Sequence, residues 1–272
     1  MQTVASREYK LMLKADRFKG DEAQLRQAGA ALWADLVAVV VPYAINVTGT
    51  AEVEHKRRQV SFLDTSERWL RSNDYVVRER KDLDGSEREI TLKFRHPDRY
   101  ISQDRDMAPA EDYEPDMKFE EDIKPEFLKL YSFSSSIVVP EDLRLATLAD
   151  VKALYPGLAD AVEEFPADEQ LEVVGGFSAY ERVVKGTGFQ IRKNPEATAE
   201  CSLTVWYPSE QDLNPLLAEF SFKYESADES YSAKMARRAY DAYQAIQAKL
   251  DAWLDAESTT KTAYVYGHKQ QA

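Results

Sequence analysis

Charged residues alternate with apolar residues along three segments of the chain, 7–14, 75–81 and 87–95. Successive side chains of a strand point to opposite faces, so a period of two predicts strands whose charged residues share one face. The residues that share a face are Glu8 with Lys10, Arg78 with Arg80, and Lys93 with Arg95. One such strand is typical of a sheet that faces solvent. Several of them, with charges of both signs, indicate a sheet curled around a polar interior that holds an anion.

Further elements follow from the same pattern. Hydrophobic residues recur at helical spacing in 21–42, 143–165 and 229–255, which predicts helices there, the first with Asp21 as its N-cap and the second interrupted at Pro156. An Asp-Gly turn at 82–85 predicts a hairpin between the second and third charged strands. Shorter strands are expected at 59–63, 171–174, 179–184, 188–192, 200–207 and 218–224.

The segment 96–117 is polar, contains three prolines and has no periodicity. It is expected to be a loop, and the pattern favours a disordered insertion over a flap that closes on a ligand. No repeat, low-complexity run or linker divides the chain, so one domain is predicted over residues 1–257. Residues 258–272 are expected to form a weakly ordered tail.

Composition limits the partners that the chain is expected to bind. The chain has 272 residues, of which 44% are hydrophobic and 31% charged, which is enough for a hydrophobic core. Its formal net charge of -13 argues against nonspecific binding to nucleic acid or to a membrane surface, because both need a basic face. An acidic total still allows a buried basic site, since the surplus carboxylates can all lie on the outside.

Cysteine content and hydropathy indicate the compartment. The single cysteine, Cys201, excludes an internal disulfide framework, fits a reducing compartment and lies where a small buried strand residue is expected. The first residues show no basic segment followed by an apolar core, and the apolar window 36–45 is too short to cross a bilayer. We therefore expect a cytoplasmic protein.

Four short motifs occur in an order that resembles one known superfamily. They are Glu8 with Lys10 in the first strand, followed by the segments 62–65, 77–80 and 90–93. This order is similar to that of the CYTH or triphosphate tunnel superfamily, which includes thiamine triphosphatases, inorganic triphosphatases and class IV adenylate cyclases. The resemblance covers residues 6–243, and its strongest part is the region from the second motif to the fourth.

The resemblance implies an α+β fold, in which a closed antiparallel β-barrel of about eight strands forms a tunnel and helices pack outside it. The tunnel would bind a triphosphate through lysine and arginine, while carboxylates hold Mg²⁺ or Mn²⁺. The residue types fit this chemistry, because phosphate oxygens accept hydrogen bonds from cationic donors and hard divalent ions bind carboxylate oxygens.

The resemblance, together with the faces predicted above, assigns residues to these roles. The cations expected to bind phosphate are Lys10, Arg78, Arg80, Lys93, Arg95, Arg182, Lys223, and Lys234 or Arg237. The carboxylates implied to hold the metal ion are Glu8, Glu120, Asp122 and Glu219. The implied catalytic residues are Glu8, Lys10 and Lys93.

The chain also departs from the family pattern. Ser6, Thr204 and Ser221 stand where the pattern has carboxylates, and Lys223 adds a cation to the same region. A site with fewer carboxylates should bind a divalent ion more weakly. The phosphate-binding half of the site is therefore predicted to be retained and the metal-binding half to be weakened.

Each pair of charges also has a plain structural interpretation. Without the motif order, Arg78 with Arg80 would be interpreted as part of a solvated sheet face. Glu8 would form an ion pair with Lys10 or Arg80 instead of binding a metal ion.

Three functions stay open at this point. The first is metal-dependent hydrolysis of a triphosphorylated small molecule, with Glu8 and Glu219 on the cation. The second is a non-catalytic module that binds polyphosphate or an organic anion and has a degenerate metal site. The third is a tunnel adapted to another organic anion, with Trp206 and Phe222 reshaping one wall. The expected partners are a triphosphate-containing molecule or polyphosphate and a second copy of the chain in a homodimer, but neither nucleic acid nor membrane.

Overall fold

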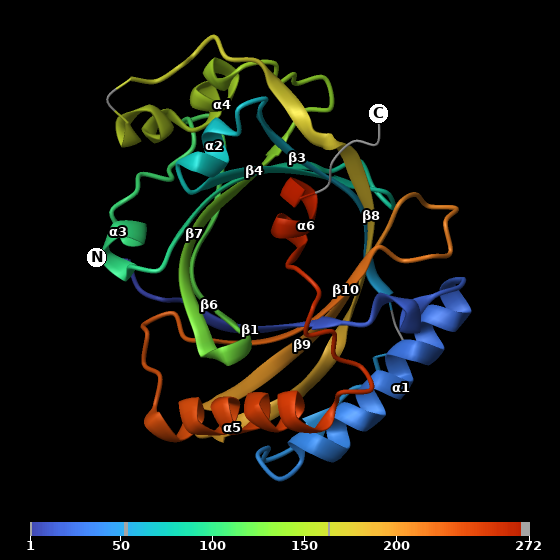
Figure 1. Ribbon diagram of the computed structural model, residues 1–272. Coiled ribbons are helices and arrows are strands. Elements are labelled where there is room, and N and C mark those ends of the chain that lie inside the picture. Colours follow the sequence, from blue (N-terminus) through green and yellow to red (C-terminus); the bar gives the residue numbers. More distant parts are fainter. Residues whose placement is uncertain (1, 52–53, 163, 268–272) are drawn as a thin grey trace.

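The strands of this protein close into a ring, with most of the helices outside it, as the computed structural model shows (Figure 1). The structure describes residues 2–51, 54–162 and 164–267. The strands are β1 (Ser6–Leu13), β2 (Val47–Thr48), β3 (Glu54–Thr65), β4 (Tyr75–Asp82), β5 (Arg88–His96), β6 (Asp116–Lys124), β7 (Leu128–Val139), β8 (Leu171–Lys193), β9 (Glu196–Tyr207) and β10 (Leu217–Glu225). They pair in the order β2-β8-β3-β4-β5-β7-β6-β1-β10-β9, and β9 also pairs with β8. Among the described residues, nine strands therefore form a closed barrel, with β2 added beside β8.

The closed barrel confirms the fold expected from the sequence, with two differences. The ring has one more strand than expected, and β1 pairs with β6 in the parallel direction, whereas the other described pairings are antiparallel. The parallel register places Glu8 beside Asp122, and the antiparallel partner β10 places Lys223 on the other side of Glu8. The strand order thus brings charges from distant parts of the chain together.

Strand β8 runs for 23 residues through three segments that were expected to be separate strands. Gly175 and Gly176 lie within it at φ values of 69° and 61°, in the left-handed region that glycine adopts without strain. They bend the strand and do not end it, and the pairing with β3 shifts register nearby, between Ser61 and Leu63. The bent strand pairs with both β3 and β9 and thereby closes the barrel.

Two long helices, α1 (Glu22–Val40) and α5 (Ala233–Lys249), cover one side of the barrel (Figure 1). The predicted N-cap of α1 is confirmed, because Asp21 Oδ1 accepts a hydrogen bond of 3.0 Å from Gln24 N. The shorter helices are α2 (Trp69–Ser72), α3 (Arg99–Gln103), α4 (Leu148–Leu154) and α6 (Lys261–Gly267), with 3₁₀ turns η1 (Ala15–Phe18), η2 (Pro125–Phe127) and η3 (Pro156–Ala161). None of the described helices combines the length and the apolar character that crossing a membrane requires.

The polar segment 96–117 is ordered and packs against the barrel, so the expectation of a disordered insertion is wrong. It contains α3, whose N-cap Asp98 accepts hydrogen bonds through its side chain from the backbone N–H groups of Tyr100 and Ile101. Met107 is buried in the cluster that includes Phe94, and the guanidinium of Arg105 lies 4.6 Å from the centre of the Phe94 ring. These contacts are tertiary and leave no periodic pattern in the sequence.

The hydrophobic core lies between the strands and the surrounding helices. On one side, Leu36 of α1 and Tyr243 of α5 belong to a cluster with Phe220 and Phe222 of β10. On the other side, α4 packs against β5 and β7 through Leu148, Val151, Leu154, Ile90, Leu92 and Ile137. Because one face of each of these strands packs against the helices outside, the opposite face points into the barrel. The charged faces predicted from the sequence therefore line the interior.

The C-terminal helix α6 lies within the ring of strands (Figure 1). Val265 is buried in a cluster with Phe62 and Trp206, and the hydroxyl of Tyr266 donates a 2.9 Å hydrogen bond to Asp64 Oδ2. A weakly ordered tail was expected over residues 258–272, but residues 261–267 are helical and docked, and residues 268–272 lie outside the described residues. A seven-residue helix is too short for hydrophobic periodicity to reveal it.

Asp64 lies on β3 and forms hydrogen bonds with both α2 and α6. Substitutions at Asp64 therefore test how much these bonds contribute to the docking of α6. Asp64 is fully buried, and its carboxylate accepts hydrogen bonds from the backbone N–H groups of Thr65, Leu70 and Arg71 and from the Tyr266 hydroxyl. We expect Asp64→Ala to lower the free energy of unfolding by about 3 kcal/mol, because several buried donors lose their acceptor. Tyr266→Phe removes one of these bonds and should cost about 1 kcal/mol. Urea denaturation measures both losses, and equal losses would contradict this account.

Candidate functional site

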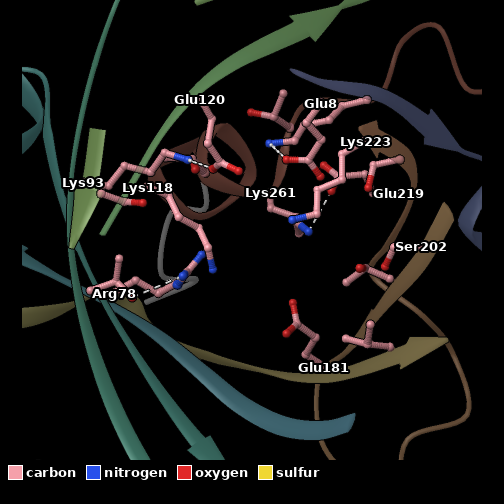
Figure 2. A pocket seen from close by; sticks show the side chains of 18 of the residues that line it. Glu8, Arg78, Lys93, Lys118, Glu120, Glu181, Ser202, Glu219, Lys223 and Lys261 are labelled. Atoms are coloured by element: carbon pink, nitrogen blue, oxygen red, sulfur yellow. Dashed lines mark hydrogen bonds and ion pairs between the residues drawn. The ribbon is translucent and has the colours of Figure 1, made fainter. Parts of the chain in front are cut away.

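The interior of the barrel is a cavity of about 1220 Å³ with charged walls. Among the described residues, thirteen lysines and arginines line it, against eight aspartates and glutamates. The whole chain has a formal net charge of -13, so the cavity and the rest of the molecule carry opposite signs of charge. Figure 2 shows Arg78, Lys93 and Lys118 on one side of the cavity, and Lys223 and Lys261 on the other. A positive cavity in an acidic protein concentrates the electrostatic field on its interior and attracts anions.

The first group of charges, the Asp122 cluster, surrounds the fully buried carboxylate of Asp122 on β6. Its contacts are Lys10 Nζ at 2.8 Å, Arg95 Nη2 at 3.0 Å, Lys93 Nζ at 3.7 Å, and Ser132 Oγ, which donates a hydrogen bond of 2.7 Å. Lys10 Nζ also lies 2.9 Å from Glu8 Oε2. The parallel pairing of β1 with β6 causes this arrangement, since it sets the first charged strand directly beside Asp122.

Burial disfavours every charge in the Asp122 cluster, and the ion pairs decide which charges are well compensated. Burial opposes the ionised form of Asp122, but Lys10, Lys93 and Arg95 outweigh burial and hold the pKa of Asp122 well below its usual range. Burial also opposes the charge of Lys10, but Asp122 and Glu8 raise its pKa. Lys93 differs, because burial and repulsion from Arg95 and Lys10 lower its pKa to about 8 despite the attraction of Asp122. Lys93 therefore carries a charge that the protein compensates only in part.

The second group, the arginine cluster, consists of Arg58 on β3, Arg78 and Arg80 on β4, and the carboxylates Glu89 and Glu181. Arg58 Nη2 lies 2.5 Å from Glu181 Oε1, and Arg80 lies 3.5 Å from Glu89 and 4.0 Å from Glu181. Arg78 is 3.9 Å from Glu89. The Nε atoms of all three arginines are buried and have no hydrogen-bond partner among the described residues. Three guanidinium groups thus share two carboxylates and retain unused donors.

The pKa values in the arginine cluster express the same excess of positive charge. Burial, followed by repulsion from Arg80, lowers the pKa of Arg78 to about 9. Burial also lowers the pKa of Arg80, and Arg58 adds to this effect. Arginine keeps its proton in proteins, so a lowered pKa measures the free-energy cost of holding these charges close together. A bound anion would remove part of that cost.

Three of the carboxylates expected to hold a divalent ion already contact cations. Glu8 and Asp122 both contact Lys10, as described above. Glu120 accepts a 2.7 Å hydrogen bond from Ser6 Oγ and lies 4.0 Å from Lys93 Nζ. Ser6, which stands where the family pattern has an acid, thus holds a neighbouring acid in place.

The fourth expected ligand, Glu219 on β10, lies 2.8 Å from Lys261 Nζ. Within the part of the chain that the structure describes, no three residues of the types that bind metals come together as an ion site. Mg²⁺ and Mn²⁺ need several oxygen ligands, and a lysine or arginine beside each carboxylate competes with the ion for them. The side chains present therefore do not fit a divalent metal ion.

Most of the site residues predicted from the sequence lie together in the barrel. Those that line the cavity are Glu8, Lys10, Arg78, Arg80, Lys93, Arg95, Glu120, Glu219 and Lys223. Asp122 lies behind this wall and holds three of the cations through its ion pairs. The sequence predicted that these side chains lie close together, and the structure places them so. Their chemical roles stay predictions.

Two predicted phosphate-binding residues lie elsewhere. Arg182 on β8 lies 3.9 Å from Glu22 of α1, outside the barrel, because the alternation of the strand turns Glu181 and Val183 inward. The expectation that Arg182 lines the tunnel is therefore wrong. Lys234, at the start of α5, is exposed on the outside and does not line the cavity. The alternative, Arg237, is also exposed on α5.

Sequence reasoning missed several cavity residues, chiefly Arg58, Lys118, Lys124, Glu181 and Lys261. Lys118 and Lys124 alternate with apolar residues in 116–124, a signal that the polar flanking segment obscured. Lys56 and Arg58 alternate on the cavity face of β3 and continue into Val60 and Phe62, but Arg57 between them is also charged, so the run 56–58 shows no polar–apolar alternation. Lys261 follows no motif, and only the docking of α6 brings it inside.

Comparisons with known proteins agree with this architecture only distantly. No model of a protein family matches the chain, and no curated protein matches it. Solved structures that align with it include a candidate adenylyl cyclase from Hippeastrum, described as having a dominant triphosphatase activity, at a TM-score of 0.48, 10% identity and coverage of 98% of this chain and 97% of that one. Candidate adenylate cyclases from Bacillus halodurans and Vibrio parahaemolyticus align at TM-scores of 0.39 and 0.37, each at 10% identity, covering 98% and 96% of this chain and 100% and 98% of theirs. These scores carry no argument about function, and the fold rests on the observed strand order.

We expect the Lys93 ammonium to titrate with a pKa of about 8 while Lys10 stays protonated, because only Lys93 is poorly compensated. Reductive methylation with ¹³C-formaldehyde labels both amines, and NMR follows each methyl signal as the pH rises. Lys93→Arg and Lys10→Arg assign the signals. Asp122→Asn should lower the midpoint of Lys93 further, since Asp122 provides the main attraction that raises its pKa. A Lys93 midpoint at the usual value for lysine would refute this description of the site.

Proposed function

We propose that this protein binds the triphosphate group of a small molecule, or a short polyphosphate, inside the barrel. The observation that carries the proposal is the arginine cluster, in which three guanidinium groups share two carboxylates and keep buried Nε donors without partners. A buried donor without an acceptor is costly, and phosphate oxygens would supply the missing acceptors. An anion bound there would gain free energy from hydrogen bonds that the free protein leaves unmade.

The distribution of cations favours an extended anion over a single phosphate. Lys93 on β5 pairs in register with Val76 on β4, two residues before Arg78, so both cations lie on the cavity face of adjacent strands. Lys118 and Lys223 lie on opposite sides of the same cavity (Figure 2). A chain of phosphate groups could therefore contact cations from both clusters. The motif order that resembles the CYTH superfamily supports the same class of ligand.

Hydrolysis with a divalent ion, for which Glu8, Lys10 and Lys93 were the expected catalytic residues, has less support. Burial would raise the pKa of Glu8, but Lys10 outweighs burial and holds this pKa below its usual value. A carboxylate held in this way is a weak general base and a poor ligand for a further cation. The proposed function is therefore binding, and phosphate release separates it from hydrolysis.

Titration calorimetry with inorganic tripolyphosphate in EDTA should detect binding to the wild-type protein. Arg80→Met should weaken the affinity about 10- to 100-fold, because a charged hydrogen bond contributes roughly 1.5–3 kcal/mol. Lys234→Met removes the same charge from the outside of the barrel and should leave the affinity unchanged. The thermal stability of Arg80→Met should match the wild type, because Glu181 keeps Arg58 as its partner.

Two results would contradict the proposed function. No binding of tripolyphosphate by the wild type would refute an anion-binding tunnel of this kind. Phosphate release from tripolyphosphate, thiamine triphosphate or ATP that requires Mg²⁺ or Mn²⁺, and that is lost in Glu8→Ala and Glu219→Gln, would establish hydrolysis instead. We expect the wild type to release no more phosphate than the Lys93→Met variant, whether Mg²⁺, Mn²⁺ or EDTA is present.

The affinity for tripolyphosphate should fall as the pH rises above the pKa of about 8 that Lys93 and Lys124 have in the free protein. A bound anion favours the protonated lysines and raises their pKa values, so binding near that pH takes up protons. Below it both lysines already carry their protons, so their titration should no longer change the affinity. Calorimetry in two buffers of different ionisation enthalpy counts the protons taken up. Lys93→Met should reduce that number relative to the wild type, and an unchanged number would contradict the assignment.

A further inference from the structure

The C-terminal segment carries a lysine into the cavity. After α5 the chain runs back along β1, where Leu254 bridges to Leu13 and the N–H of Asp255 donates to Met12 O. Helix α6 then lies inside the ring of strands (Figure 1), and the residues at its start, Thr260 to Thr262, line the cavity. Lys261 thus reaches the interior from a segment that is not part of the barrel wall.

Lys261 contacts the carboxylate that the family pattern assigns to a metal ion. Its Nζ lies 2.8 Å from Glu219 Oε1, and Glu219 is only 5% exposed. Lys10 also acts on this region, since Glu219 is one of the carboxylates that raise the pKa of Lys10. Figure 2 shows Lys261 between Glu219 and the centre of the cavity. Glu219 is therefore already compensated by ammonium groups that belong to the protein.

The position of this ammonium group is fixed by other contacts of α6. Val265 is 1% exposed in the cluster with Phe62 and Trp206, and Tyr266 is hydrogen-bonded to Asp64. The backbone that carries Lys261 therefore stays docked if the Lys261 side chain is changed. The ammonium can meet an incoming anion without a rearrangement of the helix, which is the condition for a preorganised binding group.

We propose that Lys261 binds the anionic ligand and takes the position beside Glu219 that a divalent cation would otherwise occupy, so that binding requires no metal ion. This inference rests on the proposed function, because it names how that same cavity holds its anion. An ammonium group and a divalent ion both neutralise a carboxylate and attract phosphate oxygens, but the ammonium is permanently attached to the chain. Lys261 and a metal ion would therefore compete for Glu219.

The experiment compares the tripolyphosphate affinities of the wild type and four variants by calorimetry, each with EDTA and with Mg²⁺. The wild type should bind in EDTA, and Mg²⁺ should not be required for binding. Lys261→Met should bind about 10-fold more weakly or worse in EDTA, because a charged hydrogen bond to phosphate is lost. Lys261→Arg should keep most of the affinity. Lys249→Met, which removes an exposed lysine at the end of α5, is the matched control and should bind as the wild type does.

The Glu219→Gln variant distinguishes two roles of this pair of residues. Either Lys261 binds the anion, or Glu219 binds a metal ion that helps to hold the anion. If Lys261 binds the anion, removal of the Glu219 charge frees the ammonium, and the affinity should rise several-fold in EDTA. If Glu219 is a metal ligand that helps to hold the anion, the same change should lower the affinity in Mg²⁺. Circular dichroism and thermal melting of each variant establish that α6 and the barrel stay folded.

Several results would overturn the inference. They are wild-type binding that EDTA abolishes, a Lys261→Met affinity equal to that of Lys249→Met, or weaker binding by Glu219→Gln. No binding of tripolyphosphate by the wild type would instead refute the proposed function itself. In that case Mn²⁺ electron paramagnetic resonance still tests Lys261, because bound Mn²⁺ in the wild type that disappears in Glu219→Gln would show that the ammonium does not exclude the ion.

Discussion

The interior of this barrel is set by one constraint: the strands give their apolar faces to helices on the outside, so charged faces fill the inside. Charges away from water are costly unless they are paired. The Asp122 cluster meets this constraint closely, since one buried carboxylate contacts Lys10, Lys93 and Arg95. The charges of the arginine cluster are paired only in part, because its buried Nε donors have no hydrogen-bond partner among the described residues. An anion therefore gains most where the protein's own compensation is least complete.

Strand order, more than any single motif, brings the charges together. β1 lies between β6 and β10, and this places Glu8 between Asp122 and Lys223, residues that are far apart in the sequence. The bent β8 closes the ring and turns Glu181 toward Arg58. A tunnel of this kind needs a closed barrel, because an open sheet would expose the same side chains to solvent and to salt, which screens their attraction for an anion.

The predictable part of the site consists of the residues in strands where charged and apolar side chains alternate. Arg78 and Lys93 were placed correctly, because alternation along a strand fixes which side chains share a face. Arg182 was misplaced because a motif match does not fix which face a residue occupies, and a shift of one position exchanges inside and outside. Lys261 was out of reach, because a short helix docked by tertiary contacts carries no local signal. The barrel was predictable from motif order, while its parallel strand pair was not.

Neutral side chains and an added cation lie together in the region where the family pattern that the sequence resembles has carboxylates. Ser6 donates a hydrogen bond to Glu120, and Ser221 lies opposite Lys10 in the register of β1 with β10, so neither position adds negative charge. Because few carboxylates lie in this region, the positive charges of its lysines and arginines are compensated less completely. The negative charge of Glu219 is compensated by the ammonium group of Lys261. Affinity in such a site depends on proton and salt concentration, because its cations are covalently part of the chain. A metal-dependent site would instead follow the concentration of the free ion, so the two kinds of site differ in what controls binding.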